Sequence, residues 1–186
     1  WSFTSSKKSK MPLTIRAVVG KGWGQGPQHA KSLHAIFAHI PGLQVVMPST
    51  PFEAKGLLLS SIFSNDPTIF IEGRSLFSME EEVPNEPYFI ELGKAKICKK
   101  GNDITLVSFG SAMPIAFEAA KFLSTINISV EVIDLRSIKP IDKKTILDSV
   151  SKTTNLIVFE PGWKSFSISS EIIAFVSERI GSNLSN

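Results

Sequence analysis

The sequence has little cysteine, little excess charge and no long apolar run. One cysteine, Cys98, stands among 186 residues, which excludes an internal disulfide framework and a zinc site built from several thiolates. The 20 basic and 17 acidic side chains leave a net charge of +3, without the basic, aromatic-rich stripe of a nucleic-acid-binding surface. No apolar run reaches about 18 residues, so we expect no membrane span.

The composition supports a folded core, because 42% of the residues are hydrophobic and the length suits one large domain or two small ones. The chain begins at Trp1 without methionine, and its first ten residues, WSFTSSKKSK, are polar. No signal peptide is recognisable. We therefore expect a fragment of a longer protein.

Strand and helix patterns alternate along the chain. Apolar, β-branched runs predict strands at 12–19, 43–48, 68–72, 104–110, 128–135 and 156–160. Helical spacing and caps predict helices at 31–39, 51–61, 112–125, 142–153 and 167–180. This alternation predicts an α/β fold with two parallel-sheet units, each covered by helices.

Two helix starts carry recognisable caps. Thr50 precedes Pro51, which suits the first helical position, and Glu53 completes a capping box. Asp142 is the expected cap of the helix at 142–153.

The alternation stops between residues 73 and 101, where charged residues and two prolines accumulate. We interpret 81–100 as a linker between a first unit at 1–80 and a second at 101–186.

Four glycines alternate with other residues from Gly20 to Gly26. A Walker loop requires lysine and then Ser or Thr after its last glycine, whereas Pro27 and Gln28 follow here. The every-second spacing also differs from the dinucleotide fingerprint G-x-G-x-x-G. A flexible, tightly packed turn is the other interpretation.

The three histidines, His29, His34 and His39, lie five residues apart. On a helix this spacing rotates each by about 140° from the last, so they share no face and form no two-histidine metal motif. His29 stands at the predicted helix start, where the helix dipole favours a neutral ring that can exchange a proton near pH 7. We interpret His34 and His39 as surface or packing residues.

The turn Glu160–Trp163 ends a predicted strand with a carboxylate and an indole, which we interpret as a cap and an interface aromatic. Ser108 and Ser111 show no nucleophile-elbow pattern, so a serine hydrolase is not predicted.

Longer segments carry a family resemblance. The segment GWGQGPQHAKSLHAIFAHIPGLQVVMPSTPFEAKGLL resembles the beta subunit of thiamine-diphosphate-dependent 2-oxo acid dehydrogenases, with pyruvate dehydrogenase as the nearest type. LGKAKI, SVEVIDLRSIKPID and the turn 160–163 resemble later family segments in the same order. The resemblance runs from about Pro12 to Ile180. It implies that 1–80 is part of a transketolase-like pyrimidine-binding domain and that 101–186 is an incomplete transketolase C-terminal-type domain.

The resemblance implies oxidative decarboxylation of a 2-oxo acid on thiamine diphosphate, followed by acyl transfer to lipoamide on a dihydrolipoyl acyltransferase core. It implies a heterotetramer of two alpha and two beta chains, with the diphosphate and Mg²⁺ on alpha and the aminopyrimidine on beta. His29 matches the family's active-site histidine, which orients or protonates groups during acyl transfer. A bacterial cytoplasm and a mitochondrial or plastid matrix both suit a reduced Cys98.

The chain departs from the family in three places. The glutamate that activates the aminopyrimidine would lie upstream of Trp1, and the end of the C-terminal domain would lie beyond Asn186. We therefore expect this fragment alone to be inactive. The family usually reads QHSQSLEA where this chain reads QHAKSLHA, which places Lys31 and His34 near His29.

Some relatives hold a structural potassium ion with main-chain carbonyls. The matching positions are Leu13, Thr14, Ser61, Ser64 and Asp66. An ordinary helix end is the alternative interpretation of the same residues.

Other functions within and outside the class stay open. Branched-chain 2-oxo acid and acetoin dehydrogenases are the nearest alternatives, and deoxyxylulose-phosphate synthase and transketolase resemble these segments less. A non-catalytic assembly module is the alternative from another class. In that case the helix at 167–180 and Trp163 would serve subunit contacts.

Overall fold

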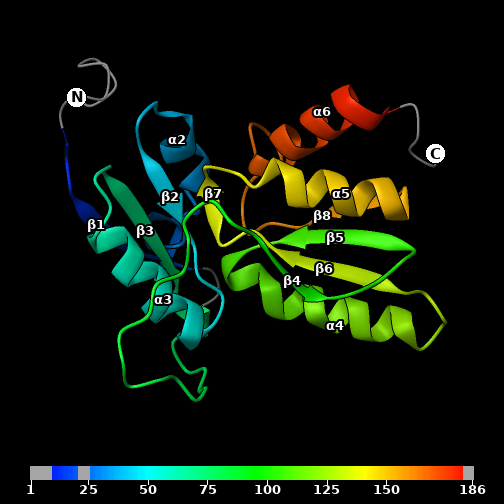
Figure 1. The fold of residues 1–186 in the computed structure, drawn as a ribbon, viewed down its shortest axis with the longest axis horizontal. Coiled ribbons are helices and arrows are strands. Elements are labelled where there is room, and N and C mark those ends of the chain that lie inside the picture. The colour runs from blue at the N-terminus through cyan, green and yellow to red at the C-terminus, as the bar shows by residue number, and fades with distance from the viewer. Residues whose placement is uncertain (1–9, 21–25, 182–186) are drawn as a thin grey trace.

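A computed structural model describes residues 10–20 and 26–181 of the chain. Two four-stranded sheets lie side by side, with helices on their faces (Figure 1). The expected helices and strands are present, each within a few residues of its predicted bounds. The α/β fold class is therefore confirmed.

The first sheet has the order β1-β3-β2-β7. Its strands are β1 (Thr14–Val19), β2 (Gln44–Val46), β3 (Thr68–Gly73) and β7 (Ser137–Lys139). Strands β1 and β2 run parallel to β3, whereas β7 is antiparallel to β2. Because β7 comes from the second half of the chain, it joins that half to the first sheet.

The second sheet has the order β4-β6-β5-β8. Its strands are β4 (Lys96–Lys99), β5 (Ile104–Ser108), β6 (Val130–Asp134) and β8 (Leu156–Val158). Strands β6 and β8 run parallel to β5, and β4 is antiparallel to β6. Each sheet therefore ends in one short antiparallel strand, β7 or β4, that the sequence patterns did not predict.

Helices cover both sheets. They are α1 (Gly26–His29), α2 (His34–His39), α3 (Pro51–Ile62), α4 (Met113–Ser124), α5 (Lys143–Thr153) and α6 (Ile168–Ile180), with short 3-10 turns at Arg74–Leu76 and Gly110–Ala112. Helix α4 lies on one face of the second sheet, and α5 and α6 lie on the other (Figure 1). Successive strand residues point to opposite faces of a sheet. Val45 accordingly joins the core that contacts α2, and Val46 packs with Leu57 of α3.

One core extends across the two sheets and the helices α5 and α6. Its fully buried members come from both halves of the chain and include Val45, Met47, Val107, Phe109, Ile133 and Ile172. The apolar side of α6 faces this core through Ile172 and Val176, so that side is not available for subunit contacts.

The segment expected as a linker, 81–100, packs against α3 and ends in β4. The Tyr88 ring stacks on Phe52 with 4.5 Å between ring centroids, and its hydroxyl donates to the Phe52 carbonyl at 2.6 Å. A side chain at Gly56 would begin 2.7 Å from atoms of Tyr88 and Ile90. Glycine at this position lets the segment lie directly on the helix.

Both expected helix caps are present, although one differs from its prediction. The Thr50 hydroxyl accepts a hydrogen bond from the Glu53 amide at 3.2 Å, and Asp142 accepts one from the Thr145 amide at 3.1 Å. The second hydrogen bond predicted by the capping box, from the Thr50 amide to the Glu53 carboxylate, is wrong, because the carboxylate contacts Ser49 instead. The Glu53 side chain therefore belongs to a buried network and not to the cap that the local pattern predicted.

Replacing Asp142 by alanine should lower the free energy of unfolding by about 1–2 kcal/mol. The carboxylate serves both the α5 cap and the Ala95 amide, from which it accepts a hydrogen bond at 3.1 Å. Chemical denaturation would measure the loss. As a control, Lys144→Ala disrupts an exposed pair with Asp148 and should change stability by less than about 0.5 kcal/mol. Equal effects of the two variants would contradict the assignment.

Candidate functional site

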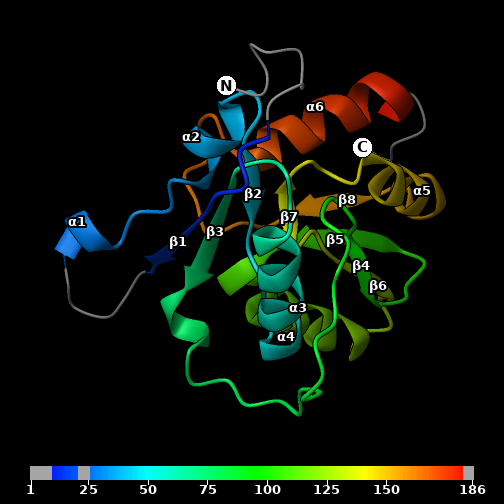
Figure 2. The ribbon, with the colours of Figure 1, turned by 60° about the vertical axis from the view of Figure 1, so that its left-hand side comes forward.

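The predicted catalytic histidine lies at the surface. His29 is the last residue of the four-residue helix α1, which projects from the edge of the molecule (Figure 2), and its side chain is exposed. The next helix, α2, begins at His34 rather than beside His29. The expectation that His29 stands at a helix start is therefore wrong. Residues 21–25 of the glycine loop lie outside the described residues.

His34 is a packing residue inside the protein. Its side chain is 1% exposed, and its ring meets Phe109 edge-on with 5.3 Å between centroids. Its Nε2 atom lies 3.5 Å from Oε2 of Glu160. The two side chains thus connect the start of α2 to the turn after β8.

Glu160 does not act as the cap that the sequence suggested. Its side chain is buried, and neither carboxylate oxygen has a hydrogen-bond partner within the described part of the chain. A Cβ atom at Gly162 would lie 3.1 Å from Cε1 of His34, so glycine allows the turn to approach the ring.

A groove of about 1340 Å³ lies beside this pair, between α2 and α6. Two aromatic side chains on its border, Trp163 and Phe166, are 84% and 97% exposed. Trp163, interpreted from the sequence as an interface aromatic, therefore presents its indole at the surface.

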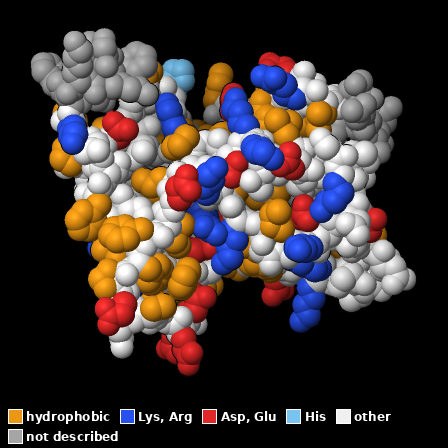
Figure 3. All heavy atoms as spheres, viewed as in Figure 1, with side chains coloured by type: hydrophobic (Ala, Val, Ile, Leu, Met, Phe, Trp, Pro, Cys, Tyr) orange, Lys and Arg blue, Asp and Glu red, His pale blue; other side chains and the backbone are white. Residues whose placement is uncertain are grey.

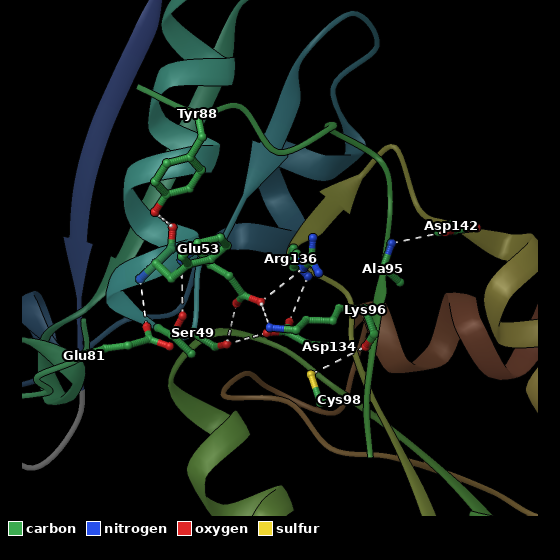
Figure 4. Close-up of polar contacts among 12 residues, drawn as sticks. Ser49, Glu53, Glu81, Tyr88, Ala95, Lys96, Cys98, Asp134, Arg136 and Asp142 are labelled. Carbon is green, nitrogen blue, oxygen red and sulfur yellow. Dashed lines mark hydrogen bonds and ion pairs between the residues drawn. The ribbon is translucent and has the colours of Figure 1, made fainter. Parts of the chain in front are cut away.

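A second polar cluster lies at the seam between the two sheets (Figure 4). It is formed by Ser49 after β2, Glu53 in the first turn of α3, Lys96 of β4, Asp134 at the end of β6, and Arg136. The Ser49 hydroxyl lies 2.9 Å from Oε2 of Glu53 and also contacts Oδ2 of Asp134. Both carboxyl groups are almost completely buried.

Nearby charges and burial shift the pKa values of the two acids of this seam cluster in opposite directions. Lys96 Nζ and Arg136 Nε lie 3.3 and 3.2 Å from Oε1 of Glu53. Burial works against ionisation of Glu53, but its hydrogen bonds to neighbouring side chains and the two cations lower its pKa. Burial, reinforced by the charge of Glu53, raises the pKa of Asp134 to about 8. One acid is therefore ionised and the other protonated near pH 7.

The positions expected to bind potassium lie around the turn between α3 and β3 and at the adjoining start of β1: Leu13, Thr14, Ser61, Ser64 and Asp66. Thr68 forms hydrogen bonds with two of these residues: its amide donates to the Leu13 carbonyl at 2.8 Å, and its hydroxyl donates to the Asp66 carbonyl at 3.4 Å. The Thr14 hydroxyl is buried without a hydrogen-bond partner among the described residues. Binding of potassium at these oxygens stays a prediction.

The described ranges, 10–20 and 26–181, contain neither a cluster of metal-binding side chains nor a helix suited to cross a membrane. No group of three or more His, Cys, Asp or Glu side chains there could hold a metal ion. No helix in the same ranges has both the length and the apolar composition needed to cross a membrane.

The sequence patterns missed the two buried polar pairs. Ser49 and Asp134 are 85 positions apart, and Glu160 follows His34 by 126. A carboxylate at the end of an apolar strand, as in VEVID, is the one local signal that could have identified Asp134.

Comparison with known families agrees with this architecture. The model of the transketolase pyrimidine binding domain matches residues 2–79, and that of the transketolase C-terminal domain matches 93–185. The order of the two matches is the order expected from the resemblance.

Two beta subunits from bacteria are similar to this chain in sequence. The chain is 42% identical over 172 residues to the Bacillus subtilis (strain 168) acetoin:2,6-dichlorophenolindophenol oxidoreductase subunit beta, covering 92% of this chain and 50% of that protein. It is 43% identical over 178 residues to a Staphylococcus aureus (strain Mu50) pyruvate dehydrogenase E1 component subunit beta, covering 95% and 55%. The chain thus spans about half the length of these relatives.

A solved structure shares the fold. It is described as a split gene transketolase, inactive beta4 tetramer, and it superposes with a TM-score of 0.79 at 26% identity, covering 91% of this chain and 55% of that one. Fold, domain order and sequence identity agree, and the chain belongs to the family that joins a transketolase pyrimidine-binding domain to a transketolase C-terminal domain.

Proposed function

We propose that this chain is part of the beta subunit of a 2-oxo acid dehydrogenase, with pyruvate as the expected substrate. The observation that carries the proposal is 42–43% identity over more than nine-tenths of the chain to beta subunits of a pyruvate dehydrogenase and an acetoin oxidoreductase. The pyrimidine-binding domain implies thiamine diphosphate, which when bound supplies the electron sink for decarboxylation.

His29 is the proposed active-site histidine. Its exposed position at the end of α1 leaves the imidazole open to a partner chain. An imidazole can exchange a proton near neutral pH and can orient a reacting thiol or acyl oxygen. Its proposed task is to orient or protonate the groups that take part in acyl transfer to the lipoyl group of an acyltransferase core.

The alpha chain is the proposed partner and would hold the diphosphate and Mg²⁺. Figure 3 shows hydrophobic side chains gathered over α3 and the segment that follows β3. Phe63 and Phe89 are 71% and 59% exposed there, and their rings meet with 5.6 Å between centroids. An exposed apolar patch of this kind is typical of a protein interface. The potassium ion proposed at the Thr68 turn would stabilise the first sheet.

The substrate can be tested with the full-length protein co-expressed with its alpha chain. We expect thiamine-diphosphate-dependent turnover of pyruvate, measured as CO₂ release, to exceed the turnover of 3-methyl-2-oxobutanoate and of acetoin. The 186-residue chain alone should release no CO₂, because the diphosphate site is proposed to lie on alpha. Faster turnover of the branched acid or of acetoin would show that this compound, and not pyruvate, is the substrate.

The compartment follows from the same proposal: a bacterial cytoplasm, or a mitochondrial or plastid matrix. Assembly with alpha but no turnover on any of the three substrates would instead identify a non-catalytic assembly module.

A further inference from the structure

The seam cluster contains one hydroxyl between two acids. The Ser49 hydroxyl lies within hydrogen-bonding distance of both Glu53 and Asp134. A hydroxyl has one proton and can donate to one carboxylate oxygen only. If both acids were ionised, the second contact would bring two acceptors together in a buried site. The geometry therefore requires that one of the two carboxyl groups carries a proton.

The neighbouring charges identify that group. Both cations of the cluster lie at Glu53, whose Oε1 atom is 3.3 Å from Lys96 Nζ and 3.2 Å from Arg136 Nε. Asp134 accepts a backbone hydrogen bond from the Arg136 amide at 2.9 Å on Oδ1. Its other oxygen, Oδ2, faces Ser49. The proton therefore belongs on Asp134, whose O–H donates to Ser49, which in turn donates to ionised Glu53.

We propose that this hydrogen-bonded chain is a proton-dependent latch between the two halves of the fold. Ser49 and Glu53 belong to the first half, and Asp134 ends the central strand β6 of the second sheet. Loss of the proton places a second negative charge in the buried seam and leaves Ser49 facing an acceptor. The contact between α3 and the second sheet should then weaken. This inference does not depend on the proposed enzymatic function.

The groups that face Asp134 set the pH range of the latch. Glu53 from α3 and burial raise the pKa of Asp134 to about 8, from an ordinary value of 3.8. Cys98 from β4 stays a neutral thiol across that range, because burial raises its pKa to about 11. A carboxyl group with a raised pKa holds a proton that the unfolded chain has lost, so its contribution to stability falls as pH rises from about 4 to 8 and then levels off.

The substitution Asp134→Asn tests the latch, because its amide donates to Ser49 at every pH and still accepts from the Arg136 amide. The thermal midpoint of the unaltered chain should fall by about 5 °C between pH 6 and pH 8.5. The asparagine variant should show little change over that range and should be the more stable of the two at pH 8.5. Equal pH dependence in both proteins would overturn the proposal.

Glu131→Gln is the matched control. Glu131 is also buried and lies on β6, but it bonds to Ser149 and Lys152 outside the seam. This variant should keep the decrease in midpoint between pH 6 and 8.5. If it lost that decrease, the effect would not be specific to the seam.

Two further measurements do not rely on thermal midpoints. The carboxyl-carbon NMR signal of Asp134 in the unaltered chain should titrate near pH 8, and a midpoint below pH 5 would overturn the proposal even if Asp134→Asn failed to fold. Amide hydrogen exchange, corrected for intrinsic rates, should show that α3 and β4 lose protection at pH 9 in the unaltered chain but not in the variant. Unchanged protection of both elements would show that no latch opens.

Discussion

Replacing Phe109 by alanine should lower the free energy of unfolding by about 3–5 kcal/mol. Phe109 follows β5, is completely buried, and belongs to the core that both sheets share. Its ring also packs edge-on against His34 of α2. Truncation removes contacts on both sides of the seam at once and leaves a cavity that neighbouring strands cannot fill.

Urea unfolding at 25 °C would measure this loss. Phe122→Ala is the matched control, since Phe122 lies on α4 with 66% of its surface exposed and should cost less than about 0.5 kcal/mol. A single transition that shifts as a whole would agree with a shared core. Two transitions, of which Phe109→Ala moves only one, would show that the halves unfold separately.

Replacing His29 by alanine in the full-length protein, assembled with alpha, should slow acyl transfer to a lipoyl domain by about 100-fold or more. The decarboxylation rate, measured with an artificial electron acceptor, should change much less, because the proposed task of His29 is confined to the transfer step. This separation would distinguish an active-site histidine from one that merely supports folding.

His39→Ala is the control for that variant, because His39 is also exposed and also ends a short helix. It should leave both rates near those of the unaltered enzyme. Equal loss in the two reactions for His29→Ala would assign the histidine to cofactor or subunit binding. Unchanged acyl transfer would remove His29 from the proposed site.

The sequence could predict elements whose signals are local. Long β-branched runs such as ITLVS gave β5, and side-chain caps at Thr50 and Asp142 gave the starts of α3 and α5. The three-residue strand β7 had no such signal. It follows Arg136 in the left-handed region, at φ 56°, and exists because it pairs with β2 from the other half. Its formation depends on tertiary contact rather than on local pattern.

The residues of the candidate site also differ in whether a local pattern could predict them. His29 is a candidate because a continuous segment resembles a family motif, and the spacing of residues does not show what surrounds its side chain. Glu53 fitted a capping pattern, yet its carboxylate lies in the seam, where hydrogen bonds and two cations offset the cost of its burial. Pairs formed across the fold, including His34 with Glu160, have no periodicity that a single sequence could reveal.

The proposed activity requires a site shared with an alpha chain. The most direct test is CO₂ release from pyruvate as purified alpha chain is titrated into a fixed amount of full-length beta chain, with thiamine diphosphate and Mg²⁺ in excess. We predict no release from either chain alone and a rate that rises and saturates near equal amounts of the two. Turnover by the beta chain alone, or a saturated complex that releases no CO₂ from pyruvate, would contradict the account.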